Sequence, residues 1–161
     1  MVYTIYTDGS FDSKRKFGVY AVYILNNETK QKEILVIPVE KKKCSNSTQI
    51  EYLAIRRAII FIINRKQKET IQKVQILSDC QSICYKLNKY EKIKCINKSI
   101  NISDIKQFKN LKNNPNIKFK IKYIPRKQNL AHKYCYKTFK KIKQKNKISK
   151  CSIKRKRNYN E

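Results

Sequence analysis

The fold is decided by the stretch YTIYTDGSFD, residues 3–12, near the start of the chain. Apolar and polar residues alternate through its first half, which predicts a strand over residues 2–8. The pattern breaks at Asp8-Gly9, where glycine permits a tight turn. The chain has only 11 acidic residues against 39 basic ones. A carboxylate at the end of an apolar strand therefore calls for an explanation.

Two more strand-like runs follow, FGVYAVYILN at 17–26 and QKEILVIPV at 31–39. Both are rich in β-branched and aromatic residues, and short polar turns separate them. This arrangement predicts an antiparallel meander of three strands.

The rest of the chain alternates helices with strands. The segment SNSTQIEYLAIRRAIIFIINRK, residues 45–66, offers N-cap residues and then apolar residues at helical spacing. The remaining expected elements are strands at 74–79 and 117–125 and helices at 80–90, 102–111 and 129–145. The order predicts an α/β fold with a five-stranded mixed sheet flanked by helices, in which the meander is followed by two parallel strands.

The length and the C-terminal composition predict how the chain is divided. A chain of 161 residues is long enough for one domain with a sizeable core, and we assign residues 1–143 to it. The segment QKNKISKCSIKRKRNYNE, residues 144–161, is lysine-rich and aperiodic. We expect it to be a flexible basic tail.

The net charge of +28 indicates a polyanionic partner, most simply nucleic acid. An alternative explanation is the bias of an A/T-rich genome, which raises the lysine content without selection for binding. A ribosomal protein would also account for the charge and the basic tail. A ribosomal protein would not, however, need Asp8, Glu51 and Asp79 to converge.

No apolar run is long enough to span a bilayer, and no secretory signal precedes the first strand. The six cysteines form no C-x-x-C pair, which argues against a structural zinc site and favours reduced thiols in an intracellular protein. We expect a cytoplasmic monomer that does not enter membranes. If the host has a nucleus, KRKR at 154–157 offers a nuclear address.

Three acids fall where solvated acids are unexpected. Asp8 and Asp79 each follow a strand, and Glu51 shares a helix face with apolar residues. Taken singly, they could be turn, N-cap or first-turn acids. Together they would repel one another unless a cation lay between them. A hard divalent ion with oxygen ligands, most simply Mg²⁺, meets that need.

Four motifs in order resemble those of the ribonuclease H family, in its type-1 and reverse-transcriptase-like branch. They are YTDGSF (6–11), STQIEYLAI (47–55), ILSDCQSI (76–83) and YIPRKQNLAHKYC (123–135). The resemblance covers about residues 1–143 and agrees with the predicted order of elements.

The resemblance implies that Asp8, Glu51 and Asp79 are metal ligands and catalytic residues. The fourth catalytic and metal-binding position, usually Asp, is His132 here, as in several relatives. Asn129 and His132 are one residue closer than the family pattern has them, and the family's glycine-rich loop with its histidine is replaced by PRKQN. His132 also shares a helix face with Cys135 and Phe139, so it could be a packing residue.

The family further implies substrate-binding roles for Ser10, Thr48 and Gln81, although capping or surface polarity would also explain them. The implied activity is metal-dependent cleavage of the RNA strand of an RNA–DNA hybrid, with two Mg²⁺ or Mn²⁺ ions per site and 5′-phosphate products. The alternative is a catalytically weak or inactive nucleic-acid-binding module with the same fold.

Overall fold

The computed structural model describes residues 1–40, 45–89 and 102–157. Its strands are β1 (Val2–Asp12), β2 (Phe17–Asn26), β3 (Lys32–Val39), β4 (Lys73–Ser78) and β5 (Lys118–Tyr123). These five strands form one mixed sheet in the order β3-β2-β1-β4-β5. β1 pairs antiparallel with β2, and β2 with β3. β1, β4 and β5 run parallel. The predicted α/β fold, with its meander and parallel pair, is confirmed.

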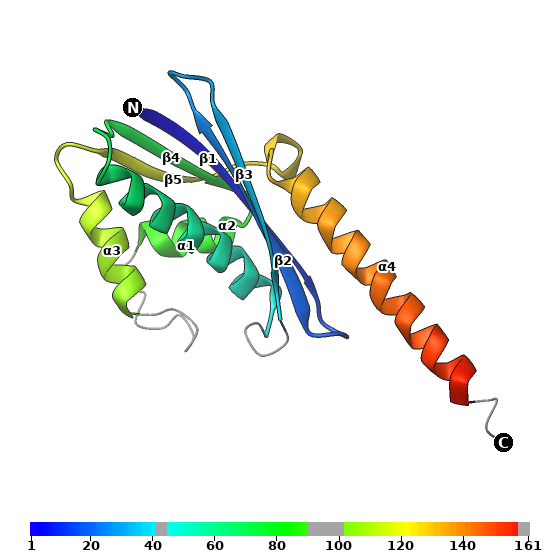
Figure 1. Ribbon diagram of the computed structural model, residues 1–161. Helices are drawn as coiled ribbons and strands as arrows, with labels where there is room; N and C mark the ends of the chain where they lie inside the picture. Colours follow the sequence, from blue (N-terminus) through cyan, green and yellow to red (C-terminus); the bar gives the residue numbers. More distant parts are fainter. Residues whose placement is uncertain (41–44, 90–101, 158–161) are drawn as a thin grey trace.

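Helices lie on both faces of the sheet (Figure 1). α1 (Ser47–Lys66), α2 (Gln81–Asn88) and α3 (Ile102–Lys112) pack on one face and share the main apolar core with it. The long α4 (His132–Arg157) crosses the other face, where Ala131 and Cys135 pack against residues of β2. Strand alternation explains the two cores, because Ile5 faces α1 and the next residue, Tyr6, faces α4.

A capping side chain fixes the start of α1, and a glycine in β2 allows the helix to pack closely on the sheet. The Asn46 side chain caps the helix by accepting a hydrogen bond from the backbone N–H of Gln49, at 2.8 Å. A Cβ on Gly18 would lie 2.5 Å from Ile50 Cδ1. Glycine at this position therefore lets the first turns of α1 settle against β2.

The predicted end of the first strand is wrong. β1 continues through Asp8 to Asp12, and Gly9 pairs with Tyr20 of β2 instead of forming a tight turn. The turn comes later: Asp12 accepts hydrogen bonds from the backbone N–H groups of Lys14 and Arg15. Continued pairing with β2 outweighs the local turn preference of Asp-Gly.

The C-terminal helix also differs from expectation. It begins at His132, after a short 3-10 helix, η3 (Arg126–Gln128), and runs to Arg157, past the end expected near residue 145. The division of the chain at residue 143 and the flexibility of the tail stay predictions. Within the described residues, no helix combines the length and apolar character that crossing a membrane requires.

Candidate active site

Three carboxylates from three separate elements meet at one place. Asp8 lies in β1, Glu51 in α1 and Asp79 directly after β4. One oxygen from each lies within 4.8 Å of the other two. The side chains of Asp8 and Asp79 are only 1% and 4% exposed, and Glu51 is 8% exposed. The predicted convergence of these residues is confirmed.

The sheet register explains the meeting of Asp8 and Asp79. The last parallel pair between β1 and β4 is Thr7 with Ser78. Asp8 and Asp79 are the next residue on each strand, so both project at the level where β4 stops. In open α/β sheets this edge, beyond the carboxyl ends of the parallel strands, is where ligands bind.

Gly9 allows the third carboxylate, that of Glu51, to lie close to the other two. A Cβ at this position would lie 2.9 Å from the backbone nitrogen of Glu51 and from Ile50 Cγ2. Only a residue without a side chain lets α1 come this close to β1. The sequence assigned Gly9 to a turn, whereas the structure shows that it is needed for helix–strand contact.

Burial and nearby negative charge oppose ionisation of Asp8 and Glu51. Burial, followed by the charges of Asp8 and Asp79, raises the pKa of Glu51 to about 9. Burial and the charge of Asp79 also raise the pKa of Asp8. Within the described part of the chain, Asp8 Oδ1 and Glu51 Oε2 are buried without a hydrogen-bond partner. Buried oxygens of this kind fit a divalent cation, which would supply the missing positive charge.

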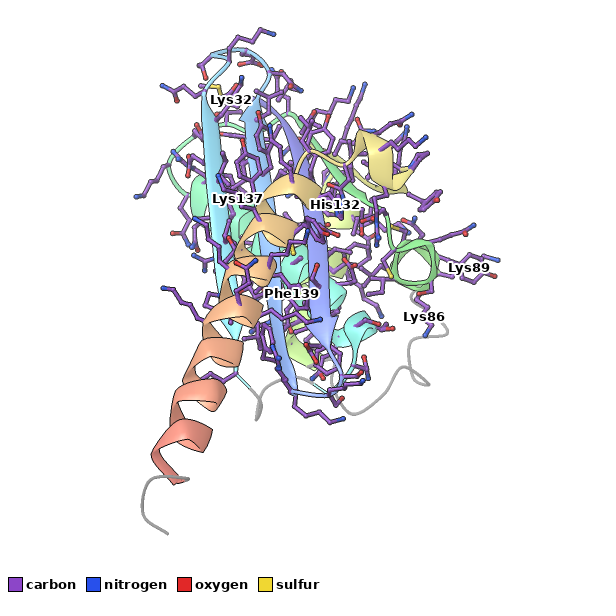
Figure 2. All side chains as sticks on the ribbon, turned by 90° about the vertical axis from the view of Figure 1, so that its right-hand side faces the viewer. Lys32, Lys86, Lys89, His132, Lys137 and Phe139 are labelled. Carbon is purple, nitrogen blue, oxygen red and sulfur yellow. The ribbon has the colours of Figure 1, made fainter. Side chains whose placement is uncertain are left out.

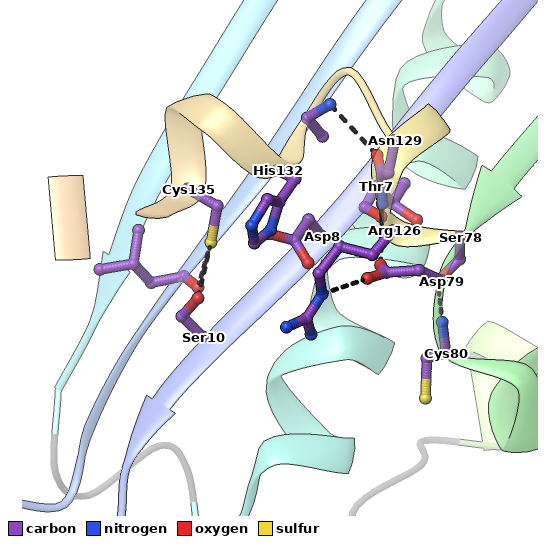
Figure 3. A network of polar contacts seen from close by, with 12 residues as sticks. Thr7, Asp8, Ser10, Ser78, Asp79, Cys80, Arg126, Asn129, His132 and Cys135 are labelled. Atoms are coloured by element: carbon purple, nitrogen blue, oxygen red, sulfur yellow. Dashed lines mark hydrogen bonds and ion pairs between the residues drawn. The ribbon is translucent and has the colours of Figure 1, made fainter. Parts of the chain in front are cut away.

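Asp79 is held by two residues from the segment before α4 (Figure 3). The side-chain amide of Asn129 donates to Asp79 Oδ1 and to the carbonyl of Thr7, both at 2.8 Å. Arg126 Nε donates to Asp79 Oδ2 at 3.0 Å. The Arg126 side chain is 66% exposed, so its guanidinium lies between the carboxylates and solvent.

His132 reaches the cluster from the first turn of α4. Its Nδ1 lies 3.1 Å from Asp8 Oδ2, and its side chain is 31% exposed. Its backbone N–H donates to the carbonyl of Asn129 at 3.1 Å. The shortened spacing between Asn129 and His132 therefore does not carry the imidazole away from the carboxylates.

The RNase H family model matches residues 1–152. The chain belongs to the ribonuclease H family. The resemblance seen in the four motifs is thereby confirmed. A search of curated proteins gave no significant match.

Solved structures of ribonucleases H share the fold of this family member. An N-terminal RNase H domain from Mycobacterium tuberculosis matches with a TM-score of 0.57 and 12% identity, covering 84% of this chain and 96% of that one. RNase H1 of Halobacterium salinarum matches with a TM-score of 0.56 and 13% identity, covering 84% of this chain and 94% of that one. LC11-RNase H1 in complex with an RNA/DNA hybrid matches with a TM-score of 0.54 and 18% identity, covering 83% of this chain and 92% of that one. At these identities the comparison establishes the fold alone.

The three expected substrate contacts are close to the carboxylates in the sequence and are not part of the cluster. Ser10 lies two residues beyond Asp8 on β1, and its Oγ accepts a long hydrogen bond of 3.5 Å from the thiol of Cys135. Thr48 is exposed in the first turn of α1, and Gln81 is exposed as the first residue of α2. Their substrate-binding roles stay predictions.

Sequence reasoning placed Arg126 and Asn129 inside a family motif but gave neither residue a role. Their partner Asp79 lies 47 and 50 residues earlier in the chain. One signal was available, because an amide and a guanidinium in a motif next to His132 are natural partners for a carboxylate.

Proposed function

We propose that this ribonuclease H family member is a metal-dependent endonuclease that hydrolyses the RNA strand of RNA–DNA hybrids. The observation that carries the proposal is the buried group of Asp8, Glu51 and Asp79, with ligand atoms within 4.8 Å. Family membership supports a nuclease. The net charge of +28 supports a nucleic-acid partner, and one structural neighbour was solved with an RNA/DNA hybrid.

The donor set fits hard divalent ions. Asp8, Glu51 and Asp79 would hold Mg²⁺ or Mn²⁺, as two ions per site, and His132 would be a further ligand or assist product release. When bound, the two ions would activate a water molecule and stabilise the leaving 3′-oxygen of an in-line displacement, leaving 5′-phosphate and 3′-hydroxyl ends.

The protein's own residues would prepare this site and orient the substrate. Asn129 fixes the orientation of Asp79 by bonding it to the strand carbonyl of Thr7. Arg126, exposed above the carboxylates, can exchange Asp79 for a substrate phosphate. Ser10, Thr48 and Gln81 would contact the hybrid, which is recognised by its shape, its phosphates and its 2′-hydroxyls. A monomeric state and a cytoplasmic location, or a nuclear one in a eukaryote, remain predictions.

The test is cleavage of a hybrid whose RNA strand carries an end label, with Mg²⁺ or Mn²⁺ present. Asp8→Asn should abolish cleavage and leave the fold intact, because removing one of several crowded negative charges relieves repulsion. Asp12→Asn is the matched control on the same strand: it caps a turn, and asparagine caps equally well. Full activity in Asp8→Asn would refute the catalytic assignment.

A second candidate is a binding module that keeps the fold and cleaves poorly. Both oxygens of Asp79 are already engaged, by Asn129 and Arg126, and His132 stands where a carboxylate is usual. The same assay separates the two functions, since a binding module would shift the hybrid in a native gel without cutting it in either metal.

A further inference from the structure

The outward side of α4 carries an aromatic ring that the fold does not use. Tyr134 stacks on Tyr23, with ring planes 25° apart, and Phe139 stacks on Phe17, with planes 24° apart. Both rings are therefore taken up by packing against β2. Tyr136 is instead 45% exposed, although it occupies the same two turns of the helix.

Tyr136 belongs to a row of stacked side chains, here called the ladder, that starts beside the carboxylates and consists of His132, Tyr136 and Lys140. Its ring stacks on the imidazole of His132, with centroids 5.8 Å apart and planes 22° apart. One turn further on, the ammonium of Lys140 lies 4.6 Å from the centroid of the Tyr136 ring. Since His132 contacts Asp8, the ladder leads from the candidate active site out along α4.

The helix that carries this ladder is rich in cationic side chains. It contains no Asp or Glu between His132 and Arg157. In Figure 2, His132 and Lys137 lie near the start of α4, which crosses in front of the sheet. Between His132 and Lys145 the helix carries Lys133, Lys137, Lys140, Lys141, Lys143 and Lys145.

Lysines alone would bind any polyanion, but an exposed aromatic ring among them favours a nucleic acid with unpaired bases. A base can stack on a protein ring only when it is not already stacked and paired inside a duplex. Proteins that bind single strands combine such rings with a basic track for the phosphates. The flexible Lys140 ammonium, now over the ring, can give way to a base and take up its phosphate.

We propose that Tyr136 and Lys140 form a binding site for an unpaired nucleotide of a single-stranded segment that continues from the bound hybrid. The proposal rests on the proposed function in one respect, that the chain binds nucleic acid at the carboxylate site. It does not require that the chain cleaves. The site extends the substrate class from a plain hybrid to a hybrid joined to a single strand.

The chain offers a matched control on the other side of His132 (Figure 2). On α2, Tyr85 is 57% exposed, and Lys89 Nζ lies 4.5 Å from the centroid of its ring. This pair has the same residues at the same spacing as the pair on α4, but it has no stack onto His132. It therefore tests whether position, rather than any exposed tyrosine–lysine pair, matters.

The experiment measures binding by fluorescence anisotropy in EDTA, so that cleavage plays no part. The probes are a short blunt RNA–DNA hybrid and the same hybrid with an unpaired RNA extension at its 5′ or its 3′ end. We expect the extension at one of the two ends to tighten binding to the wild type. Tyr136→Ala should remove most of that gain, roughly 5- to 150-fold for one stacked base. Tyr136→Phe and Tyr85→Ala should retain it, and Lys140→Gln should reduce it.

Three results would overturn the proposal. One is equal affinity of the wild type for extended and blunt hybrids. Another is a reduction of the gain in Tyr85→Ala to the same degree as in Tyr136→Ala. The third is an equal weakening of blunt and extended hybrids by Tyr136→Ala, which would make Tyr136 a positioning residue for His132. A protein that binds as expected but cuts no hybrid would refute the proposed function and leave this site standing.

Discussion

Replacing Glu51 by glutamine should stabilise the metal-free protein, although the proposed function needs the Glu51 carboxylate. The carboxyl is 8% exposed, and its Oε2 is buried without a partner within the described residues. Burial and the charges of Asp8 and Asp79 raise its pKa to about 9. Glutamine has nearly the shape of the protonated acid and cannot ionise.

The size of the effect follows from proton linkage. At pH 7 the folded state keeps a proton on Glu51 that the unfolded chain has lost. The pKa moves from 4.5 to about 9. Between the unfolded-state pKa of 4.5 and pH 7, each pH unit lowers the free energy of unfolding of the wild type by about 1.4 kcal/mol. The total at pH 7 is about 3 kcal/mol. Because the folded-state pKa is raised, this cost is about 1 kcal/mol at pH 5 and reaches about 6 kcal/mol near pH 9.

Urea unfolding in EDTA at several pH values from 5 to 9 measures the difference. We expect Glu51→Gln to be more stable than the wild type, by an amount that grows with pH. At pH 7 its melting temperature should lie roughly 10 °C higher. Glu33→Gln is the control, because Glu33 is exposed and paired with Arg65; it should change stability by less than about 1 kcal/mol. A difference for Glu51→Gln that does not grow between pH 5 and pH 8 would refute the reasoning.

Three further predictions address the approach of α1, the fourth site position and the tail. Gly9→Ala places a Cβ 2.9 Å from the backbone nitrogen of Glu51 and should destabilise the protein by about 1–3 kcal/mol; an unchanged urea midpoint would contradict it. The wild type should cleave hybrids faster with Mn²⁺ than with Mg²⁺, and His132→Asp should shift that preference toward Mg²⁺. Equal preference in both proteins would leave His132 as a packing residue. Truncation after Lys143 should flatten the log–log salt dependence of hybrid binding by just under one unit for each phosphate that the tail neutralises, and an unaltered slope would show that the tail does not engage.

The sequence predicted well those features that depend on neighbouring residues. The long α1 was expected from its apolar spacing and from three candidate caps, Ser45, Asn46 and Ser47, of which Asn46 caps the helix. The antiparallel meander followed from the short turns between its strands, and the mixed sheet from the helices that join the last two strands. The core-facing position of Glu51 could be inferred because its neighbours at helical spacing are apolar, and it is buried in the structure.

Features that depend on distant partners were missed or wrong. Asp8-Gly9 is a strong local turn signal, yet both residues stay in β1 because Ala21 and Tyr20 of β2 pair with them. The hydrogen bonds from Arg126 and Asn129 to Asp79 join positions about 50 residues apart. The motif next to His132 supplies the amide and the guanidinium, but their partner is evident only when the ends of two parallel strands are placed side by side.

The metal-free site already resembles a site that holds a cation. Asp8, Glu51 and Asp79 would repel one another if all three were ionised, and the protein limits this repulsion in two ways. The raised pKa of Glu51 keeps one acid neutral at pH 7, and Arg126 supplies a positive charge at Asp79. A divalent ion binding to the three oxygens would release the Glu51 proton and compete with Arg126 for Asp79. The guanidinium would then be free to bind a phosphate of the nucleic acid, so this exposed side chain would couple occupation of the carboxylates to binding of the substrate backbone.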